Sequence, residues 1–230
     1  MSNKISNNYI NKNGFYLVDE TSPSVIDILP WVQAKILVVN TKKPLTFNLE
    51  EASKLDFYGF FYESCPAKIF FHQNAKDSFL QLSTLFFNKD FSLSSQIKSY
   101  INADNCGSDV DIIWLIEKEK LVLDGVIEIE KDTKNITAHL DMENIFLWDE
   151  WSVQSVPTLL VRSDDIEASH SSTTHSIDDE HLFYLGSRGL EKVEAKFLLT
   201  QSYFSKTFDG IKDQKEIFLD IQEIFTWLQS

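Results

Sequence analysis

Between residues 108 and 170, short apolar runs alternate with turn-forming residues in a pattern typical of β-structure. The candidate strands are Val110–Ile116, Lys120–Glu130, Ile136–Leu140, Asn144–Trp148 and Pro157–Arg162. Turn-forming residues mark the expected breaks, at Cys106–Ser108, Asp124–Gly125, Asp132–Asn135 and Pro157. Strand signals about every 8–12 residues indicate a sandwich, a barrel or a β-solenoid, and the spacing alone does not choose among them. No helical pattern intervenes, which argues against a parallel α/β sheet.

From residue 176 onwards the apolar positions follow helical spacing. Ser176 followed by Asp179 resembles a capping box, and the acidic run Asp178–Glu180 suits the positive end of a helix dipole. Gly189 is expected to end this first helix, and a second is expected from about Glu191 to Phe204. A third helix is predicted from apolar residues three and four apart: Ile217, Phe218, Ile221, Ile224, Phe225 and Leu228.

The first 105 residues carry weaker signals. Short β-prone runs occur at Phe15–Val18, Ala34–Val39, Phe57–Tyr62 and Lys68–Phe71, and a helical or loop piece is expected at Leu49–Leu55. No repeat period is evident. The predicted division is a mixed or β-helical start over residues 1–105, a β core over 106–175, and a helical domain over 176–230.

Composition narrows the function classes. The formal net charge of −14 disfavours nucleic acid and an anionic membrane surface as partners. Cys65 and Cys106 are far apart and form no C-x-x-C motif, which suits a reducing compartment, and lone thiols near aromatic runs are expected to be inert core residues. No signal peptide and no apolar run of about 20 residues is evident, so we expect a cytoplasmic protein without a membrane span.

One polar cluster could carry chemistry. Ser163–Asp165 is followed by Ser169–His175, and imidazole with carboxylate suits Fe, Zn or Mn. On a strand, His170 and Asp164 would share a face, whereas His175 would point the opposite way. One hypothesis is therefore a β-sandwich metalloenzyme that uses His170, His175 and Asp164. The other is a polar strand end that leads into a helix cap.

The chain lacks several common enzyme motifs, and their absence favours a non-catalytic protein. Neither a G-x-x-x-x-G-K-[ST] phosphate loop nor a dinucleotide fingerprint occurs, so we expect no ATP binding by this chain itself. In Gly186–Gly189 the first glycine adjoins Ser187 directly, which a nucleophile elbow does not allow.

Two segments together resemble the C-terminal signature of the SufB/SufD family of iron–sulfur cluster assembly proteins: Ser163–His170, and Ile177–Leu190 with its Leu-Phe-Tyr-Leu-Gly-Ser-Arg-Gly core. Asn144–Leu147, Val156–Leu159 and Leu123–Ile127 resemble family strands upstream. The resemblance implies a shortened right-handed parallel β-helix with a C-terminal α-helical domain. It also implies a non-catalytic scaffold that docks SufC, the ABC-type ATPase of the system, beside a second SufB/SufD-like subunit or a copy of itself.

The resemblance also implies roles for particular residues. The expected ATPase-binding residues are Leu182, Phe183, Leu185, Arg188, Gly189 and Leu190. Of the family's cluster-assembly residues only the histidine carries over, onto His170. The chain departs from the family at Ala168, where SufD-like proteins carry cysteine, and also at Ser171 and Leu140. Iron–sulfur clusters require thiolate ligands, so we expect this chain alone to hold no stable cofactor and a cluster to be present only transiently in the complex.

Overall fold

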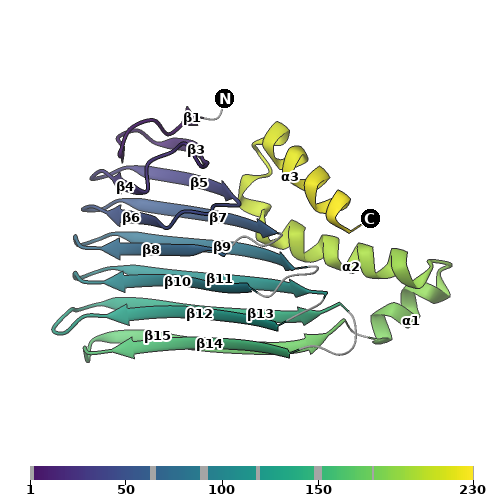
Figure 1. Ribbon diagram of the computed structural model, residues 1–230. Helices are drawn as coiled ribbons and strands as arrows, with labels where there is room; N and C mark the ends of the chain where they lie inside the picture. Colours follow the sequence, from purple (N-terminus) through teal and green to yellow (C-terminus); the bar gives the residue numbers. More distant parts are fainter. Residues whose placement is uncertain are drawn as a thin grey trace.

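The computed structural model describes residues 3–62, 66–88, 93–117, 120–147, 152–177 and 179–229. Within these ranges, strands alternate between two parallel sheets and are followed by helices (Figure 1). Sheet A contains β1 (Asn3–Lys4), β3 (Gly14–Val18), β5 (Gln33–Val39), β7 (Lys54–Tyr62), β9 (Phe79–Asn88), β11 (Gly107–Ile116), β13 (Ile136–Phe146) and β15 (Ile166–Ser176). Sheet B contains β2 (Tyr9–Ile10), β4 (Val25–Ile28), β6 (Leu45–Leu49), β8 (Lys68–Gln73), β10 (Leu93–Ile101), β12 (Lys120–Ile129) and β14 (Ser152–Val161).

Consecutive strands lie in opposite sheets, so the chain winds as a parallel β-helix in which each rung adds one strand to each sheet. All pairings between the described strands are parallel. The prediction of a mainly β, parallel β-helical body with helices at its C-terminal end is therefore confirmed. The β-sandwich assumed in the metalloenzyme hypothesis is wrong, because stacked rungs replace the hairpins that an antiparallel sandwich needs.

The rungs lengthen along the chain. Partners in neighbouring sheet A strands lie 20, then 25, then 30 residues apart, as in the pairs Gly14 with Ala34, Lys54 with Phe79, and Gly107 with Thr137. A repeat of changing length produces no fixed period in the sequence, which explains why none was evident. The first 105 residues nevertheless build β1 to β10 of the same two sheets, and Leu49–Leu55 comprises the end of β6, a short turn and the start of β7.

One turn position recurs in five successive rungs with a positive φ angle. The residue at this position lies two residues before one of the paired residues of a sheet A strand. The five residues are Trp31, Ala52, Asp77, Asn105 and Asn135. Asparagine and aspartate tolerate this left-handed conformation and also bond between rungs. Asn105 Nδ2 donates to Asp77 Oδ1 at 2.9 Å, and Asn135 Nδ2 donates to Asn105 Oδ1 at 3.0 Å. The turns therefore stack in the same register as the strands.

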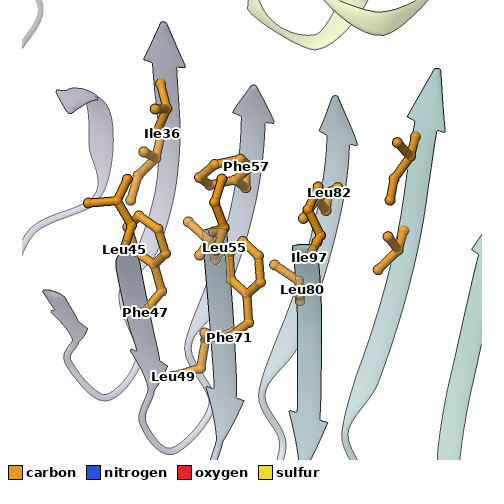
Figure 2. Packing of buried hydrophobic residues seen from close by; sticks show 14 of the residues in the cluster. Ile36, Leu45, Phe47, Leu49, Leu55, Phe57, Phe71, Leu80, Leu82 and Ile97 are labelled. Atoms are coloured by element: carbon orange, nitrogen blue, oxygen red, sulfur yellow. The ribbon is translucent and has the colours of Figure 1, made fainter. Parts of the chain in front are cut away.

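The hydrophobic core fills the space between the two sheets (Figure 2). Alternate residues of each strand point inward, as β6 and β8 show with buried Leu45, Phe47 and Phe71. Phe47 stacks on Phe71 with ring centroids 5.4 Å apart, and Phe57 meets both rings edge-on at 5.5 and 5.2 Å. Each aromatic side chain of this size buries roughly 150–250 Å² of surface.

The helices cover one end of the outer face of sheet A. They are α1 (Asp179–Ser187), α2 (Lys192–Thr207), the short 3-10 helix η1 (Asp209–Ile211) and α3 (Lys215–Leu228). Figure 1 shows α2 and α3 beside the carboxyl ends of the sheet A strands. The second halves of β7, β9 and β11 are accordingly buried on both faces, whereas their first halves alternate. A second core lies there, in which Phe60 meets the rings of Phe204, Phe208 and Phe225 at 5.9–6.0 Å.

Several local predictions are wrong. Asp124–Gly125 is not a turn but lies inside β12, where inward-facing Gly125 leaves room for Met142. Pro157 lies within β14, which tolerates proline because it is an edge strand. Asn144 continues β13 and starts no separate strand, and Ser176 still belongs to β15, three residues before the first residue of α1. Asp178, Cys65 and the segment Trp148–Trp151 lie outside the described residues.

Candidate functional site

Helix α1 is weakly attached to the rest of the molecule. None of its residues is buried, whereas α2 and α3 bury side chains such as Phe204 and Phe225. An isolated helix of nine residues is marginal in water, and tertiary packing normally stabilises it. Phe183 is 80% exposed and Tyr184 is 55% exposed, so much of the apolar surface of α1 faces solvent.

The apolar residues expected to bind the ATPase differ in how exposed they are. Leu182 and Leu185 are half-buried, and Leu182 packs against the outer core, whereas Phe183 points away into solvent. Leu190 is half-buried just beyond the helix.

Arg188 and Gly189 shape the end of α1. The Arg188 guanidinium lies 5.2 Å from the centroid of the Tyr184 ring, and it donates a hydrogen bond of 3.2 Å to Tyr184 Oη. Gly189 has a φ of 91°, and its N–H donates to the Gly186 carbonyl, while Leu190 N–H donates to Leu185 O. The predicted glycine stop is confirmed, because only glycine adopts this φ readily. A capping box occurs at the start of α2, between Glu191 and Glu194.

The opposite end of the molecule offers a long open strand. β15 pairs with β13 on one side and is the edge of sheet A on the other. All 11 of its residues are exposed or half-exposed. An unpaired edge of 11 residues presents a row of N–H and C=O groups that can pair with another chain.

The histidines of β15 face in opposite directions, as predicted. His170 pairs in register with Leu140 of the inner core, so it occupies an inward position on the last rung. His175 pairs with Ile145 of the outer core, and its Nε2 lies 3.1 Å from Glu143 Oε1. Asp164 precedes the strand. Among the described residues no group of three or more His, Cys, Asp or Glu side chains could hold a metal, so nothing here favours the metalloenzyme hypothesis.

An acidic cavity that the sequence analysis missed lies between the outer face of sheet A and the last turn of α2. Its volume is about 360 Å³, and its charged lining residues are Asp111, Asp141, Glu143 and Lys206. Burial raises the pKa of the Asp111 carboxyl above its usual range, and the neighbouring carboxylate Asp109 acts in the same direction. Lys206 Nζ lies 3.7 Å from Glu143, which ties α2 to the sheet. The sequence did contain a signal for this cavity: acidic residues occur at alternate positions of β11, and again 30 residues later at alternate positions of β13.

The buried thiol agrees with an inert role. Cys106 is 2% exposed and lies 3.3 Å from Ser78 Oγ. Burial raises the pKa of the Cys106 thiol, which leaves less of the reactive thiolate at neutral pH.

Comparison with known proteins gives consistent matches. A family model described as "SUF system FeS cluster assembly, SufBD core domain" matches residues 67–203. The iron–sulfur cluster assembly protein SufD of Escherichia coli is 25% identical over 127 residues, which are 55% of this chain and 27% of that protein. A SufBD family protein of Mycobacterium leprae is 39% identical over 69 residues, 30% of this chain and 18% of the relative. SufD of Bacillus subtilis is 26% identical over 98 residues, 40% of this chain and 22% of the relative.

These alignments therefore span less than a third of each relative. The matched core-domain region begins at β8 and ends within α2. Within the described residues, no helix is long and apolar enough to cross a membrane.

Proposed function

Because the chain belongs to the SufBD family of the SUF iron–sulfur cluster assembly system, we propose that it is a non-catalytic scaffold subunit that docks a SufC-like ATPase through its C-terminal helices. The observation that carries the proposal is α1, which has no buried residue and exposes Phe183 and Tyr184. A partner that covers these rings would provide the packing that α1 lacks. We propose a cytoplasmic location for this scaffold role.

The docking proposal predicts that Arg188→Ala and Gly189→Val abolish co-purification with the SufC-like ATPase. Arg188→Ala removes the guanidinium that holds the Tyr184 ring. Gly189→Val places a β-branched residue at a φ of 91°, at a local cost of about 1–3 kcal/mol, and redirects α1 relative to α2. Pull-down of the two purified proteins, with thermal melting of each variant, measures both effects.

Gly186→Val is the matched control for the backbone change. Gly186 lies in the same helix at an ordinary φ with open space around an added Cβ, so valine there meets no clash and has a slightly higher helix propensity than glycine. If Gly189→Val and Arg188→Ala lower the melting temperature while the folded fraction still binds the ATPase, these residues only seal the helices and the docking proposal is wrong.

We also propose that a second SufB/SufD-like subunit or a copy of this chain pairs along β15. The open edge of this strand supports the proposal. Two backbone hydrogen bonds show which amides of β15 are engaged: Ile136 N–H donates to Asp165 O, and Ile177 N–H donates to Phe146 O. Odd-numbered residues of β15 therefore bond to β13, and the N–H groups of even-numbered residues point to the open edge. Ser172 is one of these.

Ser172→Pro is expected to weaken this pairing at least about tenfold without disturbing β15 itself. Proline removes an N–H from the open side only, which edge strands tolerate. Sedimentation equilibrium of the chain alone and mixed with a SufB/SufD-like subunit measures the association. Ser172→Ala, which keeps the N–H, serves as the control. Unchanged association of Ser172→Pro in both experiments would contradict pairing along β15.

In this arrangement His170 would stand at the junction of two subunits, where it would contribute one ligand to a cluster in transit. The cluster is cargo, because the chain offers no cysteine beside His170: position 168 is alanine. Thiolates from another subunit would have to complete the site.

A further inference from the structure

The outer face of sheet B lies away from the helices, because α1, α2 and α3 all pack on sheet A. On β8, β10, β12 and β14 the odd-numbered residues point into the inner core, so the even-numbered ones point outward. Together they form a broad surface over four parallel strands. We call it the sheet B face, made of the even-numbered residues within Lys68–His72, Ser94–Tyr100, Val122–Glu128 and Gln154–Leu160.

The sheet B face carries ordered apolar and aromatic side chains. Val156 is 39% exposed and Leu160 is 42% exposed on β14, and Phe70 is half-exposed on β8. The His72 imidazole stacks on the Tyr100 ring with the ring centroids 4.7 Å apart, which orders both side chains. Apolar and aromatic groups gathered on one exposed face are typical of an interaction surface.

The charge of the sheet B face is balanced, although the whole chain has a formal net charge of −14. Two bases, Lys68 and Lys98, lie on β8 and β10, and two acids, Asp124 and Glu128, lie on β12. Two copies of so acidic a chain repel each other over most of their surface. A face without net charge, with its bases on one half and its acids on the other, is where a second copy can approach.

The strand register determines which symmetry suits these charges. A two-fold axis that runs parallel to the strands, between β10 and β12, places β10 of each copy over β12 of the other and β8 over β14. Lys98 pairs in register with Val126, so it lies level with the gap between Asp124 and Glu128. Each Lys98 would therefore meet these two acids of the other copy. An axis across the strands would instead stack β12 on β12 and bring acids together, which costs free energy.

The same arrangement matches the remaining side chains and supplies enough area for a weak dimer. His72 and Leu160 lie at one level of the sheet, so the ring of one copy would cover the leucine of the other. Four strands about 4.8 Å apart, with lengths near 30 Å, cover roughly 600 Å² per copy. The total of about 1,200 Å² is the lower end of the range for specific interfaces.

We infer that the sheet B face is a self-association surface, on which two copies of this chain pack face to face with Lys98 of each copy against Asp124 of the other. Glu128 is already engaged by Arg162 at 2.6 Å, which makes Asp124 the principal partner. The contact uses neither the C-terminal helices nor the open edge of β15. It therefore goes beyond the proposed function and does not depend on it.

The test reverses one charge in each of two chains and then mixes them. Both are made in the Ser172→Pro chain, so that pairing along β15 does not contribute. Lys98→Glu sets an acid against Asp124 of the other copy, and Asp124→Lys sets a base against Lys98. Sedimentation equilibrium is expected to show each variant alone associating at least about tenfold more weakly than the Ser172→Pro parent. An equimolar mixture should recover the parent's affinity to within about threefold, because both contacts then join a base to an acid.

Lys131→Glu is the matched control, since it changes the net charge equally but lies exposed in the turn after β12. It should associate like the parent, and circular dichroism checks that every variant folds. A parent chain that stays monomeric up to about 1 mM would overturn the inference. Weak association of both variants without recovery in the mixture would overturn it too, because the substitutions would then act within each chain. Binding of the SufC-like ATPase should be unaffected throughout, so failure of this inference leaves the proposed function standing.

Discussion

Replacing Phe60 by alanine is expected to lower the free energy of unfolding by about 3–5 kcal/mol, the usual cost of deleting a buried phenylalanine. Phe60 is fully buried on β7, and its ring meets Phe204, Phe208 and Phe225 edge-on. These contacts join the outer face of sheet A to α2 and α3. The cavity that alanine would leave cannot collapse easily, because β5 and β9 pair with β7 on both sides and hold its backbone in place.

Urea denaturation followed by circular dichroism measures this loss, and Phe183→Ala is the control. Phe183 is the same residue type but is 80% exposed, so its removal should change stability by less than about 0.5 kcal/mol. We expect one transition for strands and helices together, because they share the core around Phe60. A Phe60→Ala variant as stable as the unmodified chain would mean that the helices do not pack on sheet A as described.

Two long strands in the second half of the chain were predictable from their own residues. Val110–Ile116 and Lys120–Glu130 correspond to β11 and β12 within a few residues, and Asp132–Asn135 is indeed the turn before β13. Two other expected turns were wrong, because glycine and proline also occur within strands for other reasons. Gly125 is needed for space in the core, and Pro157 is tolerated at an edge, so neither marks a chain reversal.

The N-terminal rungs and β15 were harder to predict for different reasons. In β7 the helices cover the second half of the strand, so Phe57–Tyr62 is apolar throughout and loses its alternation. In β15 the opposite holds: the strand is polar on both faces, because its inward positions end the core and its outward positions meet water. Neither pattern has the period of two that identifies a strand.

The candidate site was predictable only in part. The segment from Ile177 to Leu190 stood out through its resemblance to a family signature, and the opposite orientation of His170 and His175 followed from strand geometry. Val193 and Leu198 gave no signal, since apolar residues in a helix usually face the core. Only the packing of α2, which uses Ala195 and Phe204 for the core, shows that these two remain outside.

Gly125→Val is expected to lower the free energy of unfolding by about 1–3 kcal/mol, the usual cost of overpacking a core. A Cβ atom at Gly125 would lie 2.7 Å from Met142 Sδ and 3.4 Å from Leu140 Cδ1. Both side chains belong to β13 in the opposite sheet, so relieving the clash requires the two sheets to repack. Thermal and urea denaturation measure the loss.

Asp124→Val tests the same stretch from the other face of the strand. Asp124 is half-exposed and alternates with Gly125, so valine there should change stability by less than about 0.5 kcal/mol, and valine is well suited to a strand. A hairpin turn at Asp124–Gly125 would give a different pair of results, because aspartate then supports the turn and its replacement by valine costs stability too. Equal destabilisation by the two variants would therefore contradict the strand interior, whereas loss at Gly125 alone places this glycine within the packed rung.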